Sequence, residues 1–225
     1  MVRFYGWARP TVSFGRNEPA RGLYDPGVAE REGVGFVRRP TGGRVVLHDD
    51  ELTYAVVAPL RAWGGLRDAY RAINRGLVRG LRALGVPAEM AGPPDGPEPA
   101  LSAGPCFRRP AEGEVVAEGG KLVGSAQARI GRSVLQHGSL IVDGSQDPLA
   151  RIGPEAAAEA GARPASLVGL LGRRPTLDEV VDSLTEGLRE ELGGQWERGG
   201  LRPEEREAGR ELEDRYRSRE WTWRR

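Results

Sequence analysis

The stretch "EVVAEGGKLVGSAQARIGRSVLQHGSLIVDG", residues 114–144, has the pattern of antiparallel β-structure. β-branched and apolar residues fill its three runs, which cover 114–118, 121–130 and 133–144. A Gly-Gly pair between two such runs is a typical hairpin signal. We therefore predict three consecutive antiparallel strands, with the first turn at the glycine pair 119–120.

The N-terminal third has the same strand character. Residues alternate around aromatic side chains in "VRFYGW" (2–7), and "TVSFG" (11–15) follows after a proline. A further strand is expected over 33–39, and two strand segments around a polar turn are expected over 45–60. The sequence thus predicts a second block of β-structure, far from the first along the chain.

One long helix is predicted between the two β-blocks. Residues 66–85 place apolar side chains at a 3.6-residue period, and Gly85 with Pro87 ends the pattern. The following residues, 91–105, are rich in proline and glycine, and we interpret them as a loop within one domain.

The last third of the chain is predicted to be helical. A short helix is expected over 155–160. Thr176 is the predicted N-cap of a second helix, because Glu179 three residues later completes a capping box. A highly charged helix over 203–221 should pack by one face only. Strands and helices in separate blocks favour an α+β fold.

Composition excludes several classes of function. The chain has 225 residues and a formal net charge of +1, with no basic footprint for nucleic acid. A single cysteine excludes an intramolecular disulfide and a cysteine-cluster zinc site, and two histidines leave few ligands for another metal. No apolar run approaches about 18 residues, and the N-terminus lacks the apolar segment of a signal peptide. We expect a cytoplasmic protein that binds neither nucleic acid nor membrane.

The chain keeps one cysteine, Cys106, and one lysine, Lys121, although 32 of its 33 basic residues are arginines. A GC-rich genome would explain the arginines, and a lone cysteine is often a small buried apolar residue. A thiol beside a cation, however, ionises readily and becomes a nucleophile. Lysine can also lose its proton when buried, which arginine cannot. The pair is therefore a candidate for acyl transfer, with a buried cysteine and a solvated lysine as the alternative.

A second candidate is "RRPTGGR", residues 38–44. Two glycines after a strand can offer N–H groups to an anion or a carbonyl oxygen, and arginines suit a carboxylate or phosphate. The segment has neither the P-loop nor the dinucleotide-binding glycine pattern. A hairpin turn with solvated arginines is the alternative. The candidate binding residues here are Arg39, Thr41, Gly42, Gly43 and Arg44.

The two histidines and two small-residue segments complete the candidates. His48 and His137 are possible partners of Cys106, but neither has a diagnostic spacing, and we favour hydrogen-bonded structural histidines. "GSAQ" (124–127) and "HGS" (137–139) place small residues on neighbouring predicted strands, which lets a ligand approach the backbone. Close packing of strands is the other interpretation. The candidates from these segments are Gly124, Ser125, Gln127, His137 and Gly138.

Taken in order, four segments resemble the LipM-type octanoyltransferases of lipoate biosynthesis, in the biotin/lipoate protein ligase superfamily. They are "RRPTGGRVVLHDDELTY", "CF", "GGKLVGSAQARIGRSVLQHGSL" and "RYRSREWTWRR", so the resemblance extends over nearly the whole chain. It implies one domain over 1–225, of α+β class, with a mixed, largely antiparallel sheet flanked by helices. Family members usually begin with an additional N-terminal helix, whereas this chain begins at the strand "RFYGW".

The resemblance also implies roles. Cys106 would be the acyl-thioester nucleophile, taking octanoyl from acyl carrier protein and passing it to a lipoyl-domain lysine, most simply that of the glycine cleavage H protein. Lys121 would favour the thiolate, and would orient or deprotonate the acceptor amine. No cofactor and no metal is implied, and we expect a monomer. The implied substrate-binding residues are Arg39, Thr41, Gly42, Gly43, Arg44, His48, Gly124, Ser125, Gln127, His137 and Gly138.

Three other functions remain compatible with the sequence. The first is an ATP-dependent lipoate–protein ligase, although such ligases need no cysteine and usually carry a glycine where Arg44 stands. The second is an amidotransferase that takes octanoyl from the H protein. The third is a non-catalytic protein that binds lipoyl domains or acyl groups.

Overall fold

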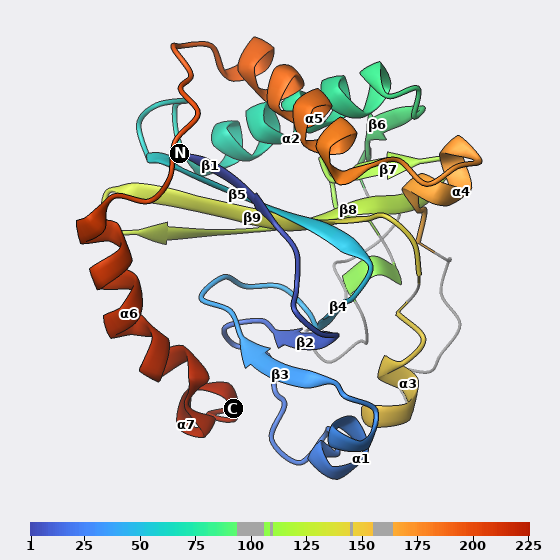
Figure 1. Ribbon diagram of the computed structural model, residues 1–225, viewed down its shortest axis with the longest axis vertical. Helices are drawn as coiled ribbons and strands as arrows, with labels where there is room; N and C mark the ends of the chain where they lie inside the picture. Colours follow the sequence, from blue (N-terminus) through green and yellow to red (C-terminus); the bar gives the residue numbers. More distant parts are fainter. Residues whose placement is uncertain (94–105, 109, 145, 155–163) are drawn as a thin grey trace.

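The computed structural model describes residues 1–93, 106–108, 110–144, 146–154 and 164–225. Figure 1 shows three layers: two long helices above, a large sheet in the middle, and a smaller sheet below. The fold is of α+β class with sheets that are largely antiparallel, as the sequence predicts. The sequence reasoning did not foresee that the strands divide into two sheets.

The large sheet has six strands in the order β1-β5-β9-β8-β7-β6. Every neighbouring pair in it is antiparallel. The predicted hairpin stretch forms its centre, because β8 pairs with both β7 and β9. The strands are β1 (Val2–Tyr5), β5 (Glu51–Pro59), β6 (Ala88–Met90), β7 (Val115–Ala117), β8 (Gly120–Ile130) and β9 (Ser133–Ile141).

The small sheet has the order β3-β2-β4, with strands β2 (Thr11–Phe14), β3 (Gly35–Arg38) and β4 (Val46–His48). β2 pairs with β3 in parallel and with β4 in antiparallel orientation. A separate apolar core lies against this sheet, around Phe14, Tyr24 and the partly buried Phe36 and Trp223. Helices α1 (Pro26–Arg31) and α3 (Leu149–Ile152) lie at its outer side in Figure 1.

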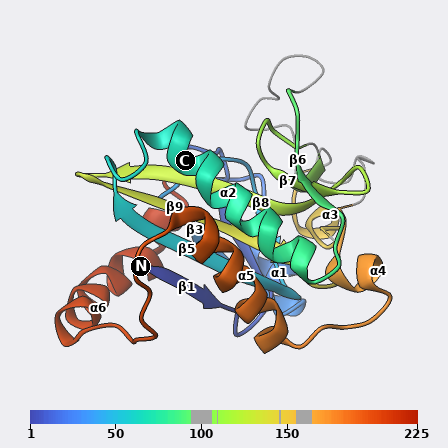
Figure 2. The same cartoon turned by 90° about the horizontal axis from the view of Figure 1, so that it is seen from above.

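Helices α2 (Leu66–Ala83) and α5 (Leu177–Leu192) cover one face of the large sheet and lie side by side in Figure 2. Glycines allow their close approach. A Cβ on Gly187 of α5 would lie 2.3 Å from the Gly80 nitrogen, and a Cβ on Gly80 would lie 2.6 Å from the Ser183 oxygen. The two helices thus pack backbone to backbone, and their apolar side chains close the main core against the sheet.

The C-terminal tail is fixed by a buried arginine. Arg38 donates to the carbonyl oxygens of Thr222, Gly15 and Glu18, and the Trp221 indole donates to the Arg38 oxygen. The tail therefore packs on β3, whereas the charged helix before it buries none of its residues. The remaining helices are η1 (Cys106–Arg108), α4 (Leu167–Leu171), α6 (Pro203–Arg217) and α7 (Arg219–Thr222).

Several local predictions can be compared with the structure. The capping box of Thr176 and Glu179 is confirmed. The first hairpin turn was predicted one residue too late, because its central residues are Glu118 and Gly119, with φ of 49° and 78°. Strand β6 and helices α1, α3 and α4 were not predicted, since each is short. The helix predicted over 155–160 and most of the loop 91–105 lie outside the described residues.

None of the helices in the described part of the chain combines the length and the apolar character that crossing a bilayer requires.

The glycine contact between α2 and α5 leads to a stability prediction. Gly187→Ala should destabilise the chain by about 1–3 kcal/mol, because the new methyl group overlaps the α2 backbone. Gly209→Ala in α6 is the matched control: nothing lies within 4 Å of its Cβ position, so better helix propensity should stabilise by up to about 1 kcal/mol. Denaturant unfolding of both variants measures this, and equal effects would contradict the proposed packing.

Candidate active site

A cavity of about 240 Å³ lies between the large and the small sheet. Its floor follows one cross-strand row of the large sheet, in which Tyr5 pairs with Thr53, Thr53 with Ser139, and Ser139 with Gly124. At ~4.8 Å between neighbouring strands, three steps span roughly 14 Å. The wall consists of Tyr5, Trp7, Ser13, Val37, Arg39, Pro40, Gly43, Val46, His48, Thr53, Cys106, Gly124, Ser125, Ala126, His137, Gly138 and Ser139.

Cys106 begins the short helix η1 at one end of this row and is half-buried. Its N–H donates to the Val45 oxygen at 2.9 Å, which ties it to the strand end of the small sheet. The next residue, Phe107, is buried against Gly124, where an added Cβ would lie 3.0 Å from the ring. Because Gly124 has no side chain, Phe107 can pack against it, and this places the neighbouring Cys106 thiol close to the sheet.

Lys121 reaches the same point from β8. Its Nζ lies 3.4 Å from the Cys106 sulfur and 3.0 Å from the Cys106 carbonyl oxygen. The Glu114 carboxylate accepts from Nζ at 2.8 Å. A register shift between Val115 and Val116 precedes this pairing, so β7 and β8 are not in simple register here. The loop between Cys106 and Lys121 therefore folds back, as contact between the two side chains requires.

The groups around Lys121 determine its charge state. Burial, the largest influence, lowers the pKa of Lys121, but negative charge on Cys106 and Glu114 and the hydrogen bonds to both raise it. The net direction is upward, so the lysine is an ammonium group at neutral pH. A cation at this distance can stabilise negative charge that develops on the sulfur during a reaction.

Arg39 organises the glycine loop on the opposite wall. Its guanidinium donates to the carbonyl oxygens of Ser13, Gly42 and Arg44. Gly43 has φ of 89°, and its oxygen lies where a Cβ on Gly15 would be, so both positions require glycine. The arginine is thus used to shape the loop, and its charge also acts on Cys106.

His137 lies on the cavity floor as a neutral ring. Its Nε2 is 2.6 Å from the Thr41 hydroxyl oxygen. Burial lowers the pKa of His137 to about 3, and the charges of Arg39 and His48 act in the same direction. This histidine therefore contributes a neutral hydrogen-bonding group to the cavity.

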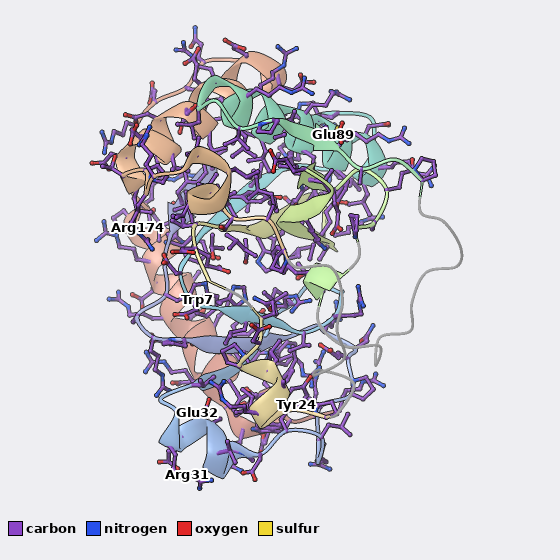
Figure 3. The ribbon with its side chains drawn as sticks, turned by 90° about the vertical axis from the view of Figure 1, so that its right-hand side faces the viewer. Trp7, Tyr24, Arg31, Glu32, Glu89 and Arg174 are labelled. Carbon is purple, nitrogen blue, oxygen red and sulfur yellow. The ribbon has the colours of Figure 1, made fainter. Side chains whose placement is uncertain are left out.

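His48 belongs to a polar cluster at the far part of the wall. Its Nδ1 lies 2.8 Å from the Glu51 carboxylate and 3.0 Å from the Ser139 hydroxyl. Its ring stacks on Trp7 with centroids 4.2 Å apart, and the Trp7 indole donates to Thr53. Trp7 is labelled in Figure 3, between the two sheets. Both histidines thus have the hydrogen-bonded environment that the sequence analysis favoured.

The predicted site residues separate into two groups. Cys106, Arg39, Gly43, His48, Gly124, Ser125, His137 and Gly138 line the cavity. Five do not: Lys121 donates to Cys106, Thr41 supports His137, Gly42 accepts from Arg39, Gln127 donates to Gln136, and Arg44 offers its carbonyl to Arg39. The roles expected for all of them stay predictions.

Sequence reasoning missed Glu114 and much of the wall. Glu114 is buried beside Lys121, yet in the sequence it is one of many glutamates and has no motif of its own. Its position before a strand that leads to the only lysine was the one available signal. The described residues include no group of three His, Cys, Asp or Glu that could hold a metal ion.

Comparisons with known proteins agree with the fold. The family model of the lipoyl protein ligase A/B catalytic domain matches residues 1–189. Octanoyltransferase LipM of Kyrpidia tusciae is 40% identical over 237 residues, which cover 99% of this chain and 86% of that protein.

Two solved structures are similar over almost the whole chain. Lipoate-protein ligase A bound with ATP has a TM-score of 0.80 and 25% identity, covering 99% of this chain and 85% of that one. A chain from a structural study of the bi-partite lipoate protein ligase and its E2 lipoyl domain from Thermoplasma acidophilum has a TM-score of 0.76 and 24% identity, covering 99% of this chain and 83% of that one.

The low pKa of His137 predicts a pH effect on stability. Its value is about 3 in the folded chain and about 6.5 when unfolded, so only the unfolded chain takes up a proton between these values. Stability should therefore fall as pH decreases from about 6.5 towards 3, by up to about 1.4 kcal/mol per pH unit. Unfolding at pH 7 and pH 5 should show a smaller loss in His137→Gln, and equal losses would refute a neutral His137.

Proposed function

The chain belongs to the lipoyl protein ligase A/B catalytic domain family, and from that premise we propose that it is an octanoyltransferase of lipoate biosynthesis. One observation carries the proposal: the Cys106 sulfur lies 3.4 Å from the Lys121 amine at the wall of the cavity. Thiol acyl transfer needs a nucleophilic sulfur, a stabilising cation and space for the acyl chain, and a thiol, an ammonium group and a cavity lie together here.

In the proposed first half-reaction, octanoyl acyl carrier protein is the donor. The Cys106 thiolate attacks the thioester carbonyl, a new C–S bond forms, and the carrier thiolate departs with the electron pair of the broken bond. Lys121 stabilises the attacking thiolate. Gly43 and Gly124 line the cavity where the carbonyl group would lie.

In the second half-reaction, the amine of a lipoyl-domain lysine attacks the Cys106 thioester, with the glycine cleavage H protein as the simplest acceptor. The new bond is an amide, and the sulfur leaves as thiolate beside Lys121. The octanoyl chain would run along the cross-strand row from Gly124 towards Tyr5. Eight carbons need roughly 9 Å at ~1.2 Å per bond, which fits within the 14 Å row. The protein would act as a monomer in the cytoplasm.

An ATP-dependent ligase is the main rival, because a similar fold occurs in lipoate-protein ligase A bound with ATP. Two features of this chain favour the transferase. Cys106, which such a ligase does not need, lies beside Lys121. Arg44 stands where such ligases usually carry a glycine. An amidotransferase that takes octanoyl from the H protein would use the same thioester chemistry, and only the donor distinguishes it.

Intact-mass measurement tests the nucleophile. Incubation with octanoyl acyl carrier protein should add one octanoyl group to the chain, because the thioester forms on Cys106. Cys106→Ala should carry no adduct, and Lys121→Arg should slow transfer by roughly 10²-fold or more, since its planar donors do not match the site. A full-rate adduct in Cys106→Ala would refute the proposal.

A donor comparison separates the rivals. The chain should label a lipoyl domain from octanoyl acyl carrier protein without ATP, because the donor is already a thioester. Labelling from free octanoate that requires ATP would favour the ligase, and octanoyl-H protein as the better donor would favour the amidotransferase. If no donor gives turnover and the chain still binds lipoyl domains, a binding protein is the better interpretation.

A further inference from the structure

Glu114 and Lys121 form a closed ion pair beneath Cys106. The nitrogen–oxygen distance is 2.7 Å, and the side chains of Lys121 and Glu114 are 1% and 5% exposed. The Ala111 N–H donates to the same carboxylate at 2.7 Å, which fixes its orientation. The pair is thus enclosed, and bulk water does not screen it.

The hydrogen bonds around Lys121 match an ammonium group. Its three N–H donors have three acceptors: the Glu114 carboxylate, the Cys106 carbonyl oxygen and the Cys106 sulfur. A neutral amine has only two N–H groups and would leave one of these acceptors without a donor. The geometry therefore fits a lysine that keeps its proton.

The other titratable groups nearby do not replace Glu114. Tyr70 of α2 and Tyr54 of β5 lie near Glu114, and burial raises the pKa of both, so they stay neutral. Arg39 acts on Cys106 from the opposite wall. Among the described residues, Glu114 and Cys106 are the groups whose negative charge acts on Lys121.

We propose that Glu114 is a positioning residue that holds Lys121 as an ammonium group in both half-reactions, so that Lys121 is not the base for the acceptor amine. The inference rests on the proposed function for its catalytic meaning. When Cys106 becomes a thioester, its negative charge disappears, whereas that of Glu114 remains 2.7 Å away. If Lys121 were instead the base that deprotonates the acceptor, the negative charge of Glu114 would have to be absent.

The second half-reaction balances without a lysine base. The acceptor arrives as a free amine, its C–N bond forms, and the C–S bond breaks with its electron pair on Cys106. The proton of the amine then passes to the Cys106 thiolate or to water. Lys121 donates a hydrogen bond to the departing sulfur throughout, and its protonation state does not change.

This account predicts how transfer depends on pH. An acceptor lysine has an ordinary pKa near ~10.4, so the reactive free amine increases about tenfold per pH unit below that value. The rate from isolated octanoyl-enzyme should therefore rise with unit slope from pH 7 to pH 9. A plateau near neutral pH would indicate a base in the site and would overturn the proposal.

The single lysine permits a direct measurement that needs no octanoyl donor. In ¹⁵N-lysine-labelled Cys106→Ser, a neutral hydroxyl replaces the uncharged sulfur of the acyl-enzyme, and the Lys121 Nζ shift reports its protonation. We expect an ammonium signal at pH 7.5, because the Glu114 carboxylate remains beside Nζ. An amine signal at pH 7.5 would overturn the inference even if octanoyl transfer were established.

Two matched variants isolate the carboxylate. In Cys106→Ser with Glu114→Gln, Lys121 should titrate roughly two or more pH units lower, because burial then acts without a compensating charge. In Cys106→Ser with Glu114→Asp, the charge is restored and the titration should move back up. Unchanged titration in the glutamine variant would refute the role of Glu114. If the glutamine variant does not fold, the Cys106→Ser spectrum still decides whether Lys121 keeps its proton, and the aspartate variant still tests the carboxylate.

Discussion

The site depends on the hydrogen bonds of the Lys121 ammonium group, because they join three segments that are separate in the chain. Lys121 holds the carbonyl and sulfur of Cys106 from η1 and the carboxylate of Glu114 before β7, and it extends from β8. A buried ion pair of this kind contributes little net stability, but removing one partner costs about 3–5 kcal/mol. The ion pair therefore matters mainly for position, because it fixes the Cys106 thiol relative to the sheet.

The second constraint is that neighbouring elements pack very close to one another. Glycines make this possible on both sides of the large sheet. On the helix side, Gly80 and Gly187 let α2 and α5 meet without side chains between them. On the cavity side, a Cβ on Gly124 would lie 3.0 Å from the Phe107 ring. Because Gly124 has no side chain, Phe107 and with it Cys106 can approach the large sheet at the cavity wall.

The sequence predicted the long elements well, because periodicity and capping act locally. Helix α2, strands β8 and β9, and the Thr176 cap all follow from patterns of neighbouring residues. The division into two sheets could not be predicted, since the pairing of β2 with β3 and β4 depends on contacts between distant segments. Strand β6 was not predicted, because a run of three residues is too short to show an alternating hydrophobic pattern.

For the site, rarity identified Cys106 and Lys121, and a glycine pair flanked by arginines identified the glycine loop. Glu114 and the cluster of Trp7, Glu51 and Thr53 could not be found this way. Their side chains become informative only through burial and through partners far away in the sequence. A glutamate is common on surfaces, and its significance here comes from being almost fully enclosed.

The contrast between Lys121 and Arg39 explains why an arginine-rich chain retains its one lysine. Arg39 uses a planar fork of donors, and its acceptors are the carbonyl oxygens of Ser13, Gly42 and Arg44, spread over two segments. At Lys121 the acceptors converge on a single nitrogen within 3.4 Å, beneath the Phe107 ring. A guanidinium cannot direct three donors from one point, and it would need the space that Phe107 occupies over Gly124. Composition therefore accounts for arginine elsewhere, and the geometry of this one position accounts for the exception.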